Sequence, residues 1–122
     1  MPRIAVIAGE PSGDQLGAGL IEALRVRRPD LRIEGIAGPR MQAAGCIAWR
    51  EADELAVMGL AEVIRHLPRL RRIIRDTRQR LLADPPDVLV GIDAPDFNLR
   101  VETTARRAGI PTVHYVSPSV WA

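Results

Sequence analysis

The sequence predicts an α/β fold in which helices cover both faces of a parallel β-sheet. Short apolar runs rich in valine and isoleucine alternate along the chain with segments whose apolar residues recur every three or four positions. Hydrophobic residues make up 47% of the chain and charged residues 26%, which is typical of a globular domain. The 122 residues suffice for one such domain. Strands that alternate with helices are joined by right-handed crossovers and therefore run parallel.

The first predicted strand, residues 3–8, runs into the turn-rich sequence GEPSGD. Ser12 and Gln15 have the spacing of a capping box, so we expect a helix to begin at about Gly13. The Pro-Asp pair at 29–30 ends this helix. A second strand over 31–37 follows, then a helical turn over 41–44 and a weaker third strand over 46–49.

Residues 53–82 have the periodicity of an amphipathic helix. An interior proline loses a backbone hydrogen bond and clashes with the preceding turn, so Pro68 predicts two helices, with the proline near the first turn of the second. The apolar residues of this pattern are Leu60, Val63, Ile64, Leu67, Leu70, Ile74 and Leu81.

The last elements are a buried strand over 88–92, a helix over 98–107 and a strand over 112–116. The expected sheet order is 3-2-1-4-5, in which the first and fourth strands are neighbours. Ligands of such sheets bind at this switch point, beyond the carboxyl ends of the strands.

Two acidic residues follow the strands at the switch point. Glu10 lies just past the first strand and Asp93 ends the fourth. Because adjacent strands lie about 4.8 Å apart, both carboxylates are expected to line one crevice. The Ala94-Pro95 pair favours an extended backbone at Asp93, which suits a general base, although capping of the next loop fits its position equally well. Asp96 directly precedes a helix, so we expect a structural capping role.

The glycine-rich turn at Glu10 could offer backbone N–H groups to a phosphate. However, its glycines do not match the G-x-G-x-x-G pattern, and Glu34 does not lie where a dinucleotide site needs an acid. The sequence therefore argues against NAD binding. At Gly17, close packing of helix on sheet and a ligand role are both open.

The remaining reactive side chains give weaker signals. His114 could act as a proton shuttle or a phosphate partner, but a satisfied core or rim residue is the favoured interpretation. His66 is expected at the surface and Cys46 in the core. No histidine or acid pair has metal-ligand spacing, so we expect neither a metal nor a cofactor.

The formal charge is only +2, and all the basic residues are arginines. They concentrate between Arg50 and Arg80, which predicts a local cationic face. We expect no nucleic-acid partner. With one cysteine, no secretory signal and no apolar run of about 20 residues, the sequence predicts a cytoplasmic protein that can lie on a membrane without crossing it.

Five stretches together resemble one known family, the lipid-A-disaccharide synthases, in register over nearly the whole chain. They are AGEPSGDQLGAGL at 8–20, GIAGPRMQAAGC at 35–46, DELAVMGLAEVI at 53–64, PDVLVGIDAPDFNLR at 86–100 and HYVSPSVWA at 114–122.

The resemblance implies the amino-terminal half of a B-type glycosyltransferase fold, a Rossmann-like domain that binds the acceptor. Residues 1–122 would form this domain, and the carboxy-terminal UDP-sugar-binding domain would be absent, so we expect this chain alone to be inactive. The implied reaction transfers 2,3-diacylglucosamine from its UDP derivative to 2,3-diacylglucosamine 1-phosphate. It inverts the anomeric centre, needs no metal, and yields the β-1,6 disaccharide of lipid A and UDP.

The resemblance also implies site residues. Asp93 matches the family's candidate general base, which inverting transfer needs to take a proton from the attacking hydroxyl, and Glu10 matches a second functional acid. The expected substrate-binding residues are Ser12, Gly13, Asp14, Asn98 and Ser117.

Both implied substrates are acylated lipids, so the cationic amphipathic segment over 58–82 is expected to meet an anionic inner-membrane surface. The candidate membrane-contact residues are Leu60, Val63, Ile64, Leu67 and Leu70. The alternative for this segment is a helix packed on the sheet with a solvated arginine face. The alternative function for the chain is a non-catalytic membrane-surface module of the same fold. A generic nucleotide-binding domain is disfavoured because the glycine pattern is missing.

Overall fold

The computed structural model describes residues 2–56 and 60–115, with side chains except at 56, 60–67 and 96. The five strands are β1 (Arg3–Ala8), β2 (Arg32–Ala37), β3 (Ile47–Glu51), β4 (Val88–Ile92) and β5 (Thr112–Tyr115). The helices are α1 (Pro11–Arg27), α2 (Pro39–Ala43), α3 (Asp53–Ala56), α4 (Leu60–Ala83) and α5 (Pro95–Arg107).

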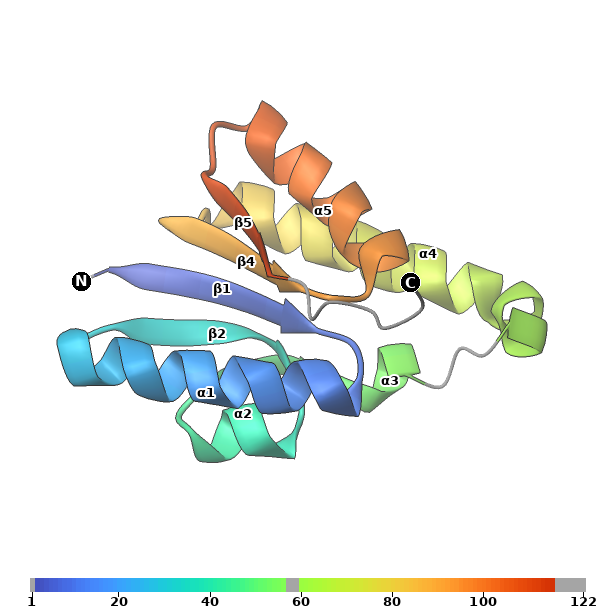
Figure 1. Ribbon diagram of the computed structural model, residues 1–122. Coiled ribbons are helices and arrows are strands. Elements are labelled where there is room, and N and C mark those ends of the chain that lie inside the picture. Colours follow the sequence, from blue (N-terminus) through green and yellow to red (C-terminus); the bar gives the residue numbers. More distant parts are fainter. Residues whose placement is uncertain (1, 57–59, 116–122) are drawn as a thin grey trace, which may run out of the picture.

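The strands form one parallel sheet in the order β3-β2-β1-β4-β5. The predicted order is therefore confirmed, and β1 and β4 are neighbours at the switch point. In Figure 1, α1 and α2 cover one face of the sheet, and α4 and α5 lie on the other. This is the α/β fold with two covered faces that the alternating pattern predicts.

Alternate residues of each central strand point into two separate cores. On β1, Ala5 and Ile7 belong to the cluster beneath α4 and α5, whereas Val6 and Ala8 belong to the cluster beneath α1. All four are 0% exposed. A sheet covered on both faces needs apolar residues at consecutive positions, which explains why its strands read as continuous apolar runs.

Gly17 lets α1 lie close to its neighbours. A Cβ built on Gly17 would lie 2.7 Å from Met41 Sδ on α2 and 3.1 Å from Ile92 Cδ1 on β4. The packing interpretation of this glycine is therefore confirmed.

The predicted capping box of α1 is wrong. The helix begins at Pro11, its N-cap is Glu10, and no side chain makes a capping hydrogen bond. Ser12 lies within the first turn. Proline at the first helical position has a suitable φ and needs no N–H partner, so the helix starts earlier than the serine spacing predicts.

The predicted break at Pro68 is also wrong, because α4 runs continuously from Leu60 to Ala83 with the proline inside. An interior proline costs a helix roughly 3 kcal/mol. Beyond it, Ile73, Ile74 and Leu81 are buried in the core beneath α4 and α5, and burial of each such side chain contributes about 1.5–3 kcal/mol. This packing offsets the local cost. Among the described residues, no helix is both long and apolar enough to cross a bilayer.

The start of α5 differs from the prediction as well. The helix begins at Pro95 instead of Asn98, and its N-cap is Ala94. Asp96 therefore lies inside the first turn and is not the N-cap. The expectation of an extended backbone at Asp93 is wrong too, since its φ is 52°. The chain has to reverse from β4 into α5 within two residues, and a left-handed turn achieves this.

Candidate functional site

The loops after β1 and β4 meet at the carboxyl end of the sheet. Ala8 and Ile92, the last residues of the two strands, are paired in register. A Cβ built on Gly9 would lie 3.1 Å from the Cβ of Ala94, so the two loops are in contact. The structure therefore brings together the loops of Glu10 and Asp93, as the switch-point argument predicts.

The turn that carries Asp93 has a strained backbone. Asp93 and Ala94 have φ values of 52° and 44°, and neither is glycine. Each left-handed residue of this kind costs on the order of 1–3 kcal/mol and persists only where its surroundings hold it. Such strain clusters at functional sites, which favours a functional role for the Asp93 turn.

Backbone hydrogen bonds hold the turn on both sides. The N–H of Asp93 donates to the carbonyl of Tyr115 at 2.9 Å, which extends the pairing of β4 with β5 by one residue. The carbonyl of Ala94 accepts from the N–H groups of Phe97 and Asn98 at 3.1 and 2.9 Å. Asp93 itself is half-buried, so its side chain remains accessible at the edge of the sheet.

The predicted substrate-binding residues fall into different surroundings. Ser12 is exposed in the first turn of α1, beside the exposed Glu10. Gly13 is buried, and a Cβ there would lie 3.5 Å from side-chain atoms of Ala8 and Ile92. Ser117 lies outside the described residues. Of the two that are described, Ser12 and Gly13, the structure presents only Ser12 to a ligand at this edge.

Asp14 has a structural task. Its side chain is buried, and its two carboxylate oxygens accept the N–H groups of Arg40 and Met41 at 2.9 Å each. These donors are the first-turn amides of α2, so Asp14 caps that helix from α1. Both oxygens are engaged in this contact.

A small cavity of about 150 Å³ opens beside Glu10, at the carboxyl ends of β1, β2 and β3. Its lining consists of Glu10, Pro11, Asp14, Gly38, Pro39, Ala52 and Asp53. Asp93 is not among them, so the expectation that both carboxylates line one crevice is wrong for this cavity. The N-terminus of the 17-residue helix α1 borders it, and first-turn amides of such a helix favour negative or polar groups. In the described part of the chain, no group of three or more His, Cys, Asp or Glu residues gathers as a metal site.

The half-buried His114 of β5 pairs with a buried acid on α5. Its Nδ1 lies 2.7 Å from Oε2 of Glu102, whose side chain is 4% exposed. The favoured interpretation of His114 as a satisfied rim residue is confirmed. Glu102 was not predicted from the sequence. Its position on the apolar face of α5, beside Val101 and Ala105, indicates that it is buried.

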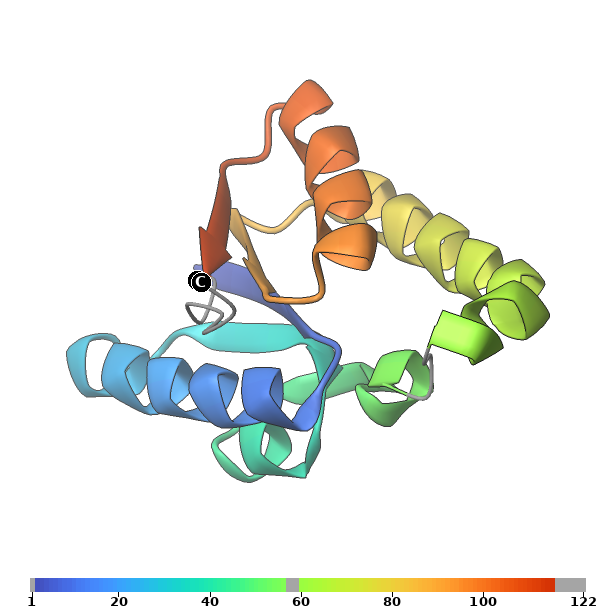
Figure 2. The same ribbon diagram turned by 45° about the vertical axis from the view of Figure 1, so that its right-hand side comes forward.

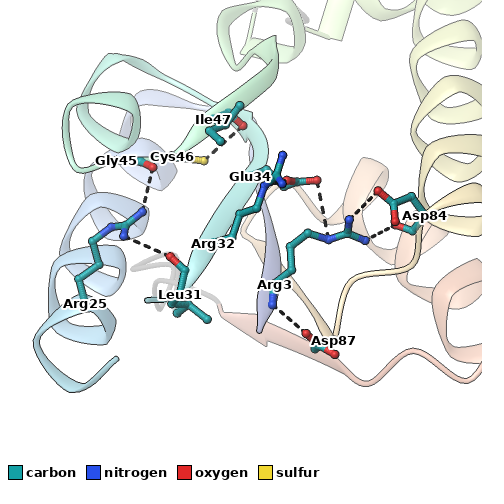
Figure 3. A network of polar contacts seen from close by, with 10 residues as sticks. All are labelled: Arg3, Arg25, Leu31, Arg32, Glu34, Gly45, Cys46, Ile47, Asp84 and Asp87. Carbon is teal, nitrogen blue, oxygen red and sulfur yellow. Dashed lines mark hydrogen bonds and ion pairs between the residues drawn. The ribbon is translucent and has the colours of Figure 1, made fainter. Parts of the chain in front are cut away.

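At the opposite end of the sheet, polar contacts are structural. Figure 3 shows Arg3 between Glu34 and Asp84, with Arg32 also paired to Glu34 at 3.0 Å. Glu34 is therefore a buried, paired acid within β2. The hydrogen bond and charge of Arg3 lower the pKa of the exposed Asp84 carboxyl. Burial raises the pKa of the Cys46 thiol to about 12, which fits the expected core role.

An arginine-rich ion-pair network joins α4 to β3 and α3. Arg50 pairs with Glu54 at 3.4 Å and Asp76 at 3.0 Å, and Arg69 pairs with Glu54 at 3.3 Å. Arg71 and Arg72 are exposed on the same helix. The predicted cationic face is therefore present, and part of its charge is engaged in holding α4 against the domain. The side chains of Leu60, Val63, Ile64, Leu67 and His66 lie outside the described set.

Comparison with known proteins agrees with this geometry. A model of the family described as lipid-A-disaccharide synthetase matches residues 4–122. The lipid-A-disaccharide synthase of Xanthomonas campestris pv. campestris (strain 8004) is 64% identical over 121 residues, which is 99% of this chain and 28% of that protein. The chain thus spans less than a third of the length of this relative.

Solved glycosyltransferases share the fold. The glycotransferase of kitacinnamycin superposes with a TM-score of 0.65 at 21% identity, over 94% of this chain and 30% of that one. The calicheamicin glycosyltransferase CalG4 gives 0.64 at 23% identity, over 95% and 32%. These likenesses agree with the Rossmann-like half of a B-type fold. The family match over residues 4–122 goes further, and this chain belongs to the lipid-A-disaccharide synthase family.

Proposed function

We propose that this chain is the acceptor-binding part of a lipid-A-disaccharide synthase. The observation that carries the proposal is the family match over residues 4–122 together with the meeting of the Asp93 and Glu10 loops at the switch point. The complete enzyme would use a second domain, beyond these residues, to hold the UDP sugar.

In the proposed reaction, the 6-hydroxyl of 2,3-diacylglucosamine 1-phosphate attacks C1 of UDP-2,3-diacylglucosamine. Asp93 accepts the hydroxyl proton while the new C–O bond forms. The bond between C1 and the diphosphate breaks, UDP leaves with the electron pair, and the anomeric centre inverts. The hydrogen bonds that hold the Asp93 turn support this role, because a base that acts on one hydroxyl needs a defined direction.

We also propose that the protein works at the cytoplasmic face of the inner membrane, with the first part of α4 as the contact element. Both Figures 1 and 2 show this part of the helix extending beyond the carboxyl end of the sheet, the end that carries the candidate site. The exposed Arg71 and Arg72 supply positive charge for anionic headgroups. This arrangement also supports the second candidate, a membrane-surface module without catalysis.

The full-length protein distinguishes the two candidates. Incubated with both acylated substrates in detergent, it is expected to release UDP and form a disaccharide that mass spectrometry identifies. Vesicle binding without any transfer would favour the surface module. Transfer to an acceptor without acyl chains at an equal rate would contradict the proposed substrate class.

A further inference from the structure

Two polar residues lie on the core-facing side of α5, where apolar side chains would otherwise pack. Asn98 and Glu102 are one helical turn apart and are 0% and 3% exposed. Both lie over Gly91 of β4, since a Cβ there would approach Glu102 Oε2 to 2.2 Å and Asn98 Cγ to 3.0 Å. The strand thus has a glycine where the polar pair needs room.

The side-chain amide of Asn98 contacts both strands of the switch point. Its Nδ2 donates to the carbonyl of Asp93 at 2.8 Å and lies 3.3 Å from the carbonyls of Ile7 and Ile92. The carbonyls of Ile7 and Ile92 lie near the carboxyl ends of β1 and β4, and the third belongs to the left-handed residue Asp93. Since carbonyl oxygens only accept hydrogen bonds, only the NH₂ end of the amide can face them.

The oxygen of the Asn98 amide carries an energetic cost that its donors have to offset. Within the described part of the chain, Asn98 Oδ1 is buried and has no hydrogen-bond partner. An unsatisfied buried acceptor is unfavourable, and a leucine of similar volume would avoid it. The hydrogen bond that Asn98 Nδ2 donates to the Asp93 turn offsets this cost. Complete burial also leaves no surface of Asn98 for the substrate contact that the sequence predicts.

We propose that Asn98 is a positioning residue that holds the left-handed turn of Asp93 and thereby aims its carboxylate at the acceptor hydroxyl. Without this amide, the turn loses its only side-chain donor among the described residues, and the backbone is free to relax toward ordinary φ values. The inference rests on the proposed role of Asp93 as the base.

A double-mutant cycle in the full-length enzyme tests this. Asn98→Leu removes the donors and keeps the volume, and it is expected to lower kcat on the order of 10- to 100-fold while the acceptor KM changes less than about twofold. In the Asp93→Asn background, the same substitution is expected to change kcat by less than about twofold, because there is no base left to aim.

Thr77→Val is the matched control. Thr77 is 4% exposed and donates to the carbonyl of Ile73 at 2.8 Å, so its replacement removes one buried hydrogen bond far from the turn.

A folded Asn98→Leu enzyme with normal kcat, or equal losses in both backgrounds, would overturn the positioning role. If Asp93→Asn alone has normal kcat, the proposed base is wrong, and a crystal structure of Asn98→Leu that keeps Asp93 at positive φ would refute the positioning role separately.

Discussion

Asp93 has a backbone conformation that tertiary contacts set. Its sequence neighbours suggest an extended backbone, yet the structure places it and Ala94 in the left-handed region. Hydrogen bonds from Asn98 and to Tyr115 hold it there. Contacts with α5 and β5 therefore fix the backbone at Asp93, and its immediate sequence neighbours do not reveal them.

Asp93→Asn in the full-length enzyme is expected to lower kcat by a factor on the order of 10² to 10⁴, the range for loss of a general base. Asparagine is one of the few residues that adopts the left-handed conformation readily, so the turn and the melting temperature should be retained. Steady-state kinetics and thermal melting measure both. Near-normal turnover in the folded variant would remove Asp93 from the mechanism.

Glu10→Ala separates a chemical from a structural role at the N-cap of α1. Glu10 makes no side-chain cap and is exposed, so its removal should change the free energy of unfolding by less than about 0.5 kcal/mol. Activity should fall in the same variant, because the proposed functional carboxylate is lost. Denaturant titration beside the activity assay gives both numbers. A loss of stability that parallels the loss of activity would assign Glu10 to loop structure instead.

At the element scale, tertiary packing changes helix boundaries that local signals suggest. Pro68 lies inside α4 because the helix beyond it packs on the sheet, and Pro11 starts α1 before the serine that resembles a cap. Leu70 is half-buried against the same core, so it is a poor candidate for a purely membrane-facing residue.

Two glycines of α1 offer a matched pair. Gly17→Ala should destabilise the protein by about 1–3 kcal/mol, because the new Cβ would lie 2.7 Å from Met41 Sδ. Gly19→Ala should stabilise it by about 0.5–1 kcal/mol, since no atom of the described residues lies within 4 Å of the new Cβ and alanine is the better helix former. Thermal and chemical denaturation measure both variants. Equal effects would show that helix propensity alone governs α1.

Membrane contact is tested by replacing Val63, Ile64 and Leu67 with serine in the full-length protein. The triple variant should no longer sediment with anionic vesicles, because the apolar side chains that enter the interface are lost. Leu70→Ser serves as the contrast and should mainly lower the melting temperature, since Leu70 packs on the core. Circular dichroism that shows unfolding of the triple variant would identify its three positions as core.

At the scale of the whole molecule, the described domain offers an acid-bearing edge without a dinucleotide-type glycine loop. Glu34, the acid of β2, is buried and paired with arginines, so it does not present a free carboxylate to a ribose. Both features support the acceptor-binding role proposed above.

Residues 1–122 expressed alone are expected to bind UDP weakly or not at all, whereas the full-length protein should bind it. Isothermal calorimetry on both proteins tests whether UDP binds to this domain or to the rest of the protein. Tight stoichiometric binding of UDP by the short chain would contradict it.

From the chain alone we predict the parallel sheet, its strand order and the edge at which the loops of Glu10 and Asp93 meet. Those features follow from apolar periodicity and from crossover handedness, which are properties of local segments. Tertiary contacts set the left-handed turn at Asp93, the continuity of α4 and the roles of Asp14, Asn98 and Glu102. Each of these depends on hydrogen bonds or burial between residues far apart in the chain, such as Asn98 Nδ2 with the carbonyl of Ile7, and local patterns carry no record of such contacts.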